Sequence, residues 1–186
     1  MPFILRKIRK ARWYGSDVLH WLPPNDVQAD SLLDLSTKHN QLSVYIVEND
    51  RSNLDRILAA LVGNCDFISN IDYALIPAAE VLDRIKIKTV EIKGETSDEQ
   101  VNTAHRDLIE LSASQILELA KSISATGERA RLTAKKVAEL IERSIDEGHI
   151  DQTRLKLSAP EIAKLRLAQP TNIELAAEGE EKGQMG

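Results

Sequence analysis

The sequence has one cysteine, few aromatic residues and no long apolar run, and each shortage excludes a class of protein. Cys65, the single cysteine in 186 residues, cannot form an intrachain disulfide, which fits a reducing compartment. No apolar stretch approaches the roughly 20 residues that a membrane helix needs. No apolar core of a signal peptide follows the basic N-terminus either. We therefore expect a cytoplasmic protein without a membrane span.

Aromatic residues make up only 4% of the chain, so aliphatic side chains must supply the core. The apolar content of 42% and the charged content of 28% are ordinary for a globular protein. A chain of 186 residues suits one domain with an appendage, or two small domains. The expected fold is α+β: a small mixed sheet containing a βαβ unit, followed by a C-terminal helical region.

Strand and helix patterns alternate in the first half of the chain. Apolar and β-branched residues predict strands over 42–47 and 71–76, and a leucine and isoleucine stripe predicts a helix over 53–62. A strand, a helix and a strand in this order predict a βαβ unit with two parallel strands. A short helix is expected over 26–37. Alternating isoleucine and lysine over 85–93 predicts an exposed edge strand.

The second half of the chain predicts helices alone. A long helix is expected over 96–124, a second helix ending near residue 147, and a short helix starting near 158. The last residues are polar and cannot bury enough surface to offset the entropy of ordering. The chain is thus divided into a small α/β domain with a basic N-terminal segment (1–94), a helical region (95–168) and a disordered acidic tail (169–186).

The N-terminal segment carries the strongest functional signal. Five basic residues precede the first acid, Asp17, and four of the seven aromatic residues lie within the first 21 positions. The whole chain has a net charge of −5, so a basic aromatic segment is joined to an acidic body. Its periodicity over 2–14 fits a strand and a helix equally. The residues predicted to bind a partner are Arg6, Lys7, Arg9, Lys10, Arg12, Trp13 and Tyr14.

Several interpretations of this segment remain open. Its basic residues can neutralise phosphates while Trp13 or Tyr14 stacks on a base, and its apolar residues suit an acidic membrane surface or a protein partner. Alternatively, the aromatic residues are core anchors and the basic residues form a solvated face. The acidic balance of the whole chain argues against a dedicated nucleic-acid binder. We expect the segment to fold onto the domain and to expose its basic side chains as one patch.

Catalytic signatures are weak elsewhere. The loop 48–52 offers Glu48, Asn49 and Asp50 as oxygen ligands for a divalent cation, although the next predicted strand adds no acid. The loop contains no glycine, which excludes a phosphate-binding loop. The four histidines lack metal-ligand spacing, and Cys65 has no neighbouring base. In the predicted long helix, His105 and Asp107 face different directions, so no triad forms locally.

The sequence therefore predicts a non-enzymatic interaction protein, an accessory subunit of a prokaryotic assembly with a protein partner. One alternative is a nucleic-acid-associated protein that acts through the basic aromatic segment. A second alternative is a small metal-dependent enzyme centred on the acidic loop from Glu48 to Ser52. We expect no cofactor and no bound metal.

Overall fold

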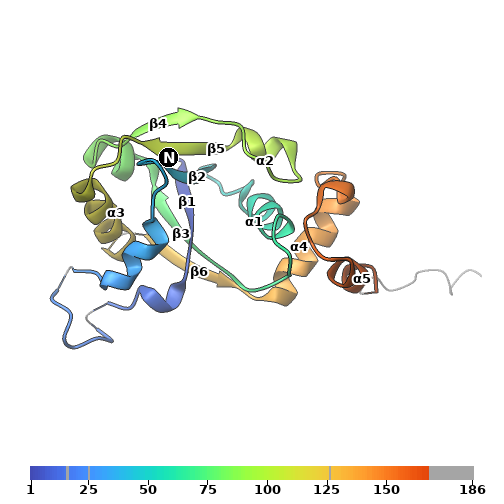
Figure 1. The fold of residues 1–186 in the computed structure, drawn as a ribbon, viewed down its shortest axis with the longest axis horizontal. Coiled ribbons are helices and arrows are strands. Elements are labelled where there is room, and N and C mark those ends of the chain that lie inside the picture. The colour runs from blue at the N-terminus through green and yellow to red at the C-terminus, as the bar shows by residue number, and fades with distance from the viewer. Residues whose placement is uncertain (16, 25, 126, 168–186) are drawn as a thin grey trace, which may run out of the picture.

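The computed structural model describes residues 1–15, 17–24, 26–125 and 127–167, which contain a six-stranded sheet in the spatial order β4-β5-β2-β1-β3-β6 (Figure 1). The strands are β1 (Phe3–Ile8), β2 (Leu42–Val47), β3 (Ile71–Pro77), β4 (Lys88–Glu91), β5 (His105–Ile109) and β6 (Glu128–Leu132). Every neighbouring pair is antiparallel. The α+β class is confirmed, but the sheet is antiparallel rather than mixed.

The N-terminal strand β1 occupies the middle of the sheet. It pairs with β2 on one side, where Ile4 faces Ile46, and with β3 on the other, where Ile4 faces Ile76. The predicted parallel βαβ unit is therefore wrong. Strands β2 and β3 still run in the same direction around helix α1 (Leu54–Gly63), but β1 lies between them and takes the hydrogen bonds of both. The local pattern of strand, helix and strand cannot show that β1, from an earlier part of the chain, inserts between the two strands.

Helices cover the two faces of the sheet. Figure 1 shows α1, α4 (Ala134–Asp146) and α5 (Ala159–Leu167) on one side, and α3 (Ala113–Ala125) on the other. The 3₁₀ segment η2 (Ala29–Leu35) and the short π-helix η3 (Glu80–Arg84) lie on the α3 side. The alternation of side chains along β1 explains this layering, because successive residues point to opposite faces. Leu5 joins the core under α1, and its neighbour Ile4 joins the core under α3.

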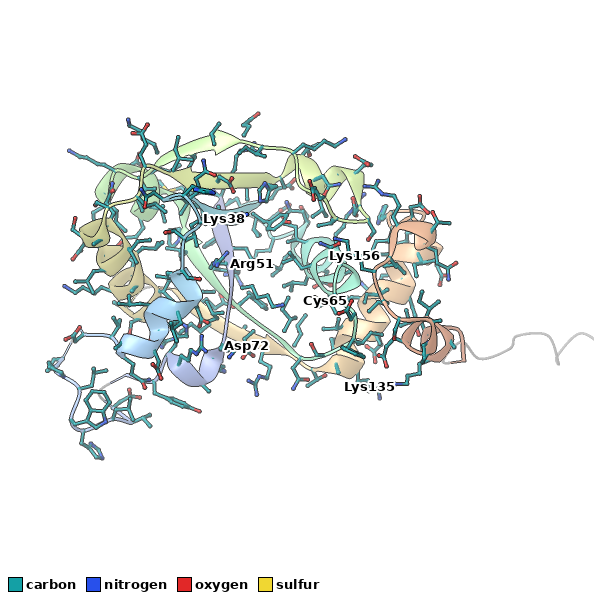
Figure 2. The ribbon with its side chains drawn as sticks, in the orientation of Figure 1. Lys38, Arg51, Cys65, Asp72, Lys135 and Lys156 are labelled. Atoms are coloured by element: carbon teal, nitrogen blue, oxygen red, sulfur yellow. The ribbon has the colours of Figure 1, made fainter. Side chains whose placement is uncertain are left out.

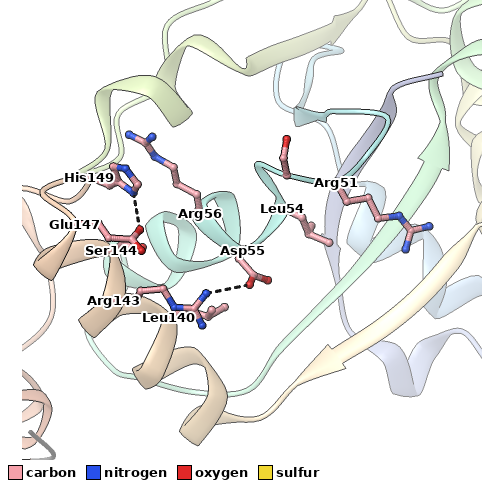
Figure 3. A pocket seen from close by; sticks show the side chains of 10 residues that line it. Arg51, Leu54, Asp55, Arg56, Leu140, Arg143, Ser144, Glu147 and His149 are labelled. Carbon is pink, nitrogen blue, oxygen red and sulfur yellow. Dashed lines mark ion pairs between the residues drawn. The ribbon is translucent and has the colours of Figure 1, made fainter.

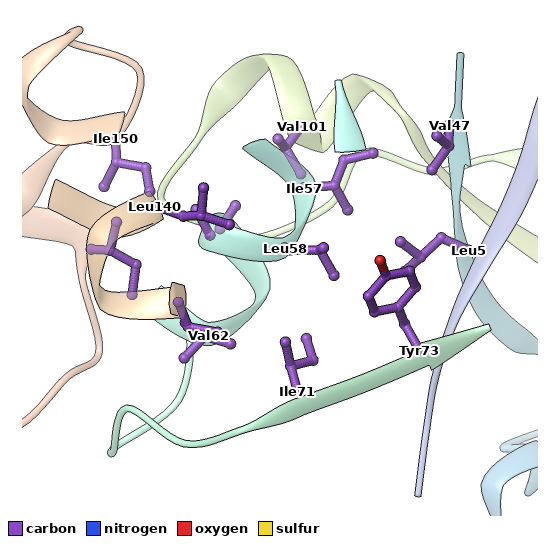
Figure 4. Close-up of a cluster of buried hydrophobic side chains, with 14 of the residues drawn as sticks. Leu5, Val47, Ile57, Leu58, Val62, Ile71, Tyr73, Val101, Leu140 and Ile150 are labelled. Carbon is purple, nitrogen blue, oxygen red and sulfur yellow. The ribbon is translucent and has the colours of Figure 1, made fainter. Parts of the chain in front are cut away.

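Two aliphatic cores result. The core under α1 and α4 is drawn in Figure 4 and includes Leu5, Ile57, Leu58, Ile71, Tyr73 and Leu140. The core under α3 includes Ile4, Val44, Ile76, Leu108, Leu119 and Ile123. Trp13 joins the second core, and Tyr73 the first. The expectation of a mostly aliphatic core is confirmed.

The predicted long helix over 96–124 is wrong. Its start is real: Asp98 accepts hydrogen bonds from the backbone N–H groups of Gln100 and Val101 and caps the short helix α2 (Glu99–Thr103). The chain then enters β5, and helix resumes only in α3. Strand β5 pairs with β2 and β4 on its two sides, and these tertiary hydrogen bonds override its helical periodicity.

The predicted helix that ends near residue 147 also begins later than expected. Residues 128–132 form the edge strand β6, and Thr133 caps α4 by accepting a hydrogen bond from the Lys136 N–H group. Gly148 follows the helix with a φ of 69°, in the left-handed region that glycine adopts without strain. The expected C-terminal helical region therefore contains two strands of the sheet.

Other local predictions hold. Strand β2 has the predicted bounds, β3 and α1 lie within a residue of theirs, and β4 is an edge strand within the predicted range 85–93. The open choice for residues 2–14 is resolved as strand β1 followed by a 3₁₀ turn, η1 (Lys10–Arg12). The helix expected over 26–37 is the 3₁₀ segment η2. The predicted disorder over 169–186 concerns residues outside the described part of the chain.

No helix among the described residues is long and apolar enough to cross a membrane.

Candidate functional site: the N-terminal basic and aromatic segment

One buried carboxylate, that of Asp34, organises the end of the N-terminal segment. Its Oδ2 atom accepts hydrogen bonds from the Arg9 backbone N–H and from the Trp13 indole Nε1–H, both at 2.8 Å. Its Oδ1 atom lies 2.8 Å from Arg12 Nη1. Only 8% of Asp34 is exposed, and its charge is compensated by one guanidinium and two N–H donors. A buried carboxylate needs such partners, so this cluster fixes the turn η1 against η2.

The half-buried Arg6 is a second link between the segment and the domain. Its guanidinium donates to the backbone carbonyl oxygen of Asp34 through Nε at 3.0 Å and Nη2 at 2.9 Å, and to that of Ser43 through Nη1 at 2.8 Å. Burial lowers the pKa of Arg6 from its usual value, and the nearby charge of Asp34 opposes that effect. The guanidinium thus holds β1 to the end of η2 and to β2.

The seven residues predicted to bind a partner fall into two groups. Arg6, Arg12 and Trp13 hold the segment in place, and Trp13 is only 4% exposed. The side chains of Lys7, Arg9, Lys10 and Tyr14 lie exposed at the surface. The expected folding of the segment onto the domain is confirmed, whereas the expected single patch contains only part of its basic side chains. Binding by these residues stays a prediction.

Asp72 on β3 links the exposed part of the N-terminal segment to β6, the edge strand of the sheet. Its Oδ2 atom accepts a hydrogen bond from the Lys10 backbone N–H at 2.8 Å, and Arg131 of β6 donates to both carboxylate oxygens at 2.6 and 2.9 Å. The Arg131 hydrogen bond holds the pKa of Asp72 below its usual value. The same hydrogen bond raises the pKa of Arg131, and the Tyr14 phenol adds to that effect. The Lys10 backbone and the Arg131 guanidinium therefore flank one carboxylate.

Beyond Tyr14 the chain leaves the body of the protein and returns at η2 (Figure 1). We call residues 14, 15 and 17–24 the protruding segment. Its base is fixed, because the Gln28 side chain donates to the carbonyl oxygens of Arg12 and Tyr14. Internal turns add backbone hydrogen bonds from Leu19 to Gly15 and from Leu22 to Leu19, and Leu22 itself is buried. Trp21, however, is 70% exposed, and Val18 is 53% exposed.

The acidic loop 48–52 is stabilised by its own hydrogen bonds. Glu48 Oε2 accepts from the Ser52 hydroxyl at 2.6 Å, and Asp50 Oδ1 accepts from the Ser52 N–H at 3.0 Å. Asn53 accepts from the Glu48 N–H and donates to the Ile46 carbonyl oxygen. Within the described part of the chain no cluster of histidine, cysteine and acidic residues could hold a metal ion. The loop therefore leads into the start of α1, and its geometry adds no evidence for the hypothesis of a metal-dependent enzyme.

A polar cluster on β2 and β5 corrects the prediction that His105 and Asp107 face different directions. In a strand, residues two apart share a face, and His105 Nε2 lies 3.7 Å from Asp107 Oδ1. The Ser43 hydroxyl donates to the same carboxylate oxygen at 2.9 Å, and the Tyr45 ring packs edge-on against His105 with centroids 5.1 Å apart. Burial, together with the Asp107 charge, raises the pKa of Tyr45.

The order of contacts in this cluster differs from that of a catalytic triad. A nucleophilic serine needs its hydroxyl against the imidazole, which then takes the proton. Here the Ser43 proton is donated to Asp107, while His105 Nδ1 lies 2.8 Å from the Ile92 carbonyl oxygen. Because a carbonyl oxygen only accepts, Nδ1 carries a proton. The cluster ties β2, β5 and the chain after β4 together.

A cleft of about 480 Å³ lies between the start of α1 and the end of α4 (Figure 3). Its volume suits a small ligand. Its three arginines are each paired with a carboxylate: Arg143 with Asp55, Arg51 with Glu128 and Arg56 with Asp98. His149 Nδ1 lies 3.2 Å from Glu147 Oε2. Because the arginines are paired in this way, the cleft offers no cluster of unpaired guanidinium groups to a ligand.

Cys65, which the sequence offered as a lone thiol, follows α1 and is half-buried. Its Sγ atom lies 3.4 Å from the Leu61 carbonyl oxygen, so the thiol bonds to its own helix.

Sequence reasoning missed Arg131, which the fold links to the N-terminal segment through Asp72, and Lys135, which lies in the first turn of α4. Arg131 was assigned to a helix but lies on β6, since the pattern of residues 128–132 fits both a helix and a strand, whereas Lys135 does lie on a helix, α4. Comparison with known protein families, curated proteins and solved structures gives no match for this chain. Its function must therefore be argued from its own surface.

Proposed function

We propose that the protein is a non-enzymatic interaction protein, an accessory subunit that docks on a protein partner through the protruding segment. The observation that carries the proposal is Trp21, 70% exposed on a segment whose base is held by hydrogen bonds. Tryptophan and tyrosine dominate the energetics of protein interfaces. A large exposed indole on a fixed support is the side chain that a partner's pocket would bury.

The geometry of the segment supports this role in a second way. Ordering a loop on binding reduces affinity, and a segment that is already folded avoids most of that loss. Here Leu22 is buried while Val18 and Trp21 remain exposed. The partner expected is therefore a protein with an apolar pocket, which receives these side chains without reordering the loop.

The experiment compares Trp21→Ala with Phe67→Ala. Phe67 is a matched control because it is 65% exposed and lies between α1 and β3, where Asp66 bonds to the start of α5. Wild type and both variants are used to capture partners from the host, and the captured protein is then purified. Titration calorimetry should show that Trp21→Ala weakens binding about 30-fold or more, equivalent to about 2 kcal/mol, while Phe67→Ala leaves it unchanged.

Two results would contradict the proposal. In one, every captured protein binds Trp21→Ala as tightly as wild type once both are pure. In the other, size-exclusion chromatography with light scattering shows a wild-type dimer that Trp21→Ala converts to a monomer. That second result would assign the segment to self-association instead of a separate partner.

A further inference from the structure

The fold assembles a basic surface from two parts of the chain that are more than a hundred residues apart. Strands β1, β3 and β6 are neighbours, and Ile8, Asp72 and Arg131 stand side by side across them. The C-terminal end of β1 and the C-terminal end of β6 therefore meet at one end of the sheet. The exposed basic residues that lie at this end of the sheet, or within five residues of it along the chain, are Lys7, Arg9, Lys10, Arg131, Lys135 and Lys136; we call them the composite basic surface.

Hydrogen bonds fix the geometry of this surface. Asp72 binds the Lys10 backbone N–H on one side and the Arg131 guanidinium on the other, so the two basic residues flank one carboxylate. Helix α4 begins just after β6, where the Ala134 N–H donates to Asn70 Oδ1 at 2.8 Å. This bond holds the first turn of α4, with Lys135, against the start of β3. In Figure 2, Asp72 and Lys135 both lie toward the lower side of the molecule.

The positive charge of the surface is only partly compensated. The carboxylates paired with its members are Asp72, which Arg131 binds, and Glu139, which lies 3.1 Å from the Lys136 ammonium group. The side chains of Lys7, Arg9, Lys10 and Lys135 are exposed and make no hydrogen bond or ion pair with any residue that the structure describes, although the Lys10 charge helps to lower the pKa of Asp72. Four cations thus face solvent on a protein whose net charge is −5.

The chemistry of the surface favours a polyanion over a protein. Protein interfaces bury apolar side chains in their centre and are depleted in lysine. The exposed Tyr14 follows Trp13, whose carbonyl oxygen accepts a hydrogen bond from Arg129 Nη1 of β6 at 3.1 Å, so an aromatic side chain starts next to β6. Nucleic acid, in contrast, is held by lysine and arginine along its phosphates, and an exposed aromatic ring can stack on a base.

We propose that the composite basic surface binds the phosphate backbone of a nucleic acid, with Tyr14 as the stacking side chain. The proposal does not depend on the docking role of Trp21. The composite basic surface extends beyond the N-terminal segment, because half of its residues come from β6 and α4. Binding is expected to depend on salt and little on base sequence, since lysine contacts to phosphate carry no sequence information.

The test uses the double variant Lys10→Glu/Lys135→Glu and the control Lys88→Glu/Lys156→Glu, which changes the net charge equally. Lys88 lies on β4, the opposite edge of the sheet from β6, and Lys156 lies beyond η4 (Gln152–Arg154); both are exposed. The probes are a fluorescein-labelled 20-nucleotide DNA strand, its RNA equivalent and the 20-base-pair duplex. Fluorescence anisotropy is recorded from 50 to 300 mM NaCl for the full chain and each variant.

We expect wild type to bind at least one probe at 50 mM NaCl, with affinity that falls linearly on a logarithmic scale of salt concentration. The Lys10/Lys135 variant should bind at least about tenfold more weakly and with a salt slope smaller by about 2, because each lysine neutralises about one phosphate. The control variant should remain within about threefold of wild type. Tyr14→Ala should weaken single-strand binding by about 5- to 100-fold and duplex binding less.

Three results would overturn the proposal. The first is the absence of binding to every probe at 50 mM NaCl. The second is equal loss in the two double variants, which would reflect net charge alone. The third is competition by a polyglutamate peptide as strong as that of an unlabelled oligonucleotide of equal charge, which would assign the surface to an acidic protein. Circular dichroism of each variant confirms that a loss of binding does not reflect unfolding.

Discussion

The two tryptophans of this protein lie eight positions apart and have opposite environments. Trp13 is 4% exposed, packs into the core under α3 and donates its indole N–H to Asp34. Trp21 is 70% exposed and lies on the protruding segment. Both belong to the stretch that combines basic and aromatic residues, so their sequence context does not distinguish them. They differ because the Asp34 carboxylate, on η2, accepts a hydrogen bond from the indole of Trp13 and not from that of Trp21.

The two environments indicate different roles for the two tryptophans. A buried indole needs an acceptor for its N–H group, and Asp34 is that acceptor for Trp13. The same carboxylate also accepts hydrogen bonds from the Arg9 backbone N–H and the Arg12 guanidinium. An indole left in water gains nothing for the fold, because its large apolar surface stays hydrated. Trp13 thus stabilises the fold, whereas Trp21 is available for contact with another molecule.

The largest effect is expected from Asp34→Ala. This change leaves the Trp13 N–H and the Arg9 N–H without an acceptor and leaves Arg12 without its counter-ion. Removal of one partner of such a buried charged cluster costs about 3–5 kcal/mol, so the free energy of unfolding should fall by that amount in urea titrations. Asp30→Ala, an exposed acid of the same segment η2, serves as the control and should change it by less than about 0.5 kcal/mol. A loss below about 1 kcal/mol for Asp34→Ala would show that the cluster does not fix the segment.

Trp13→Phe should have the next largest effect. Phenylalanine keeps an aromatic ring in the core but cannot donate to Asp34 Oδ2, which then retains only the Arg9 N–H as donor. The lost hydrogen bond and the smaller ring together should cost about 1–3 kcal/mol in the same urea titrations. The double variant Trp13→Phe/Asp34→Ala should lose less than the sum of its parts, since the two changes remove one interaction. Strict additivity would argue that indole and carboxylate do not act together.

Asp72 should make a smaller contribution that depends on pH. Its hydrogen bonds with Arg131 lower its folded pKa, so its stabilising effect is present above the unfolded value of 3.8. That effect is lost as pH falls through the lower folded pKa. Because the Arg131 side chain is half exposed, we expect Asp72→Asn to cost only about 1 kcal/mol at pH 7.

Urea titrations of wild type and Asp72→Asn between pH 7 and pH 2 measure this effect. The two stability curves should converge at the acid end of the range, where both side chains are uncharged. A constant difference across the range would assign the loss to packing rather than to charge. Asp66→Asn, an exposed carboxylate in the connection after α1, should track the wild-type curve closely.

Local sequence patterns predicted the elements whose signals are self-contained. Strand β2 is continuous and β-branched, and α1 shows a clear leucine and isoleucine stripe, so each pattern points to one structure. Strands β5 and β6 carry ambiguous patterns, and their conformation is decided by pairing with β2, β4 and β3. No local reading contains that information, which is why both were assigned to helices.

The candidate site was predictable to a similar extent. The composition of residues 3–21 identified the basic aromatic segment, but the sequence could not show that Asp34 would take Arg12 and Trp13 away from the surface. Nor could it show that Arg131 and the Lys10 N–H bind the same Asp72 carboxylate, because that arrangement depends on the position of β3 between β1 and β6. Long-range strand order, rather than residue type, determined which basic side chains lie together.

The smallest effect on stability, and the sharpest separation of the two tryptophans, is expected from Trp21→Ala. Since Trp21 is 70% exposed, its removal should change the free energy of unfolding by less than about 0.5 kcal/mol. The same variant should lose the fluorescence component that acrylamide quenches readily, and Trp13→Phe should retain it, because the quencher reaches an indole in water and not one in the core. A loss of more than about 1 kcal/mol in Trp21→Ala would mean that its indole packs on the domain in solution. Both tryptophans would then support the fold, and the protruding segment would have no aromatic side chain free to bind a partner other than Tyr14 at its base.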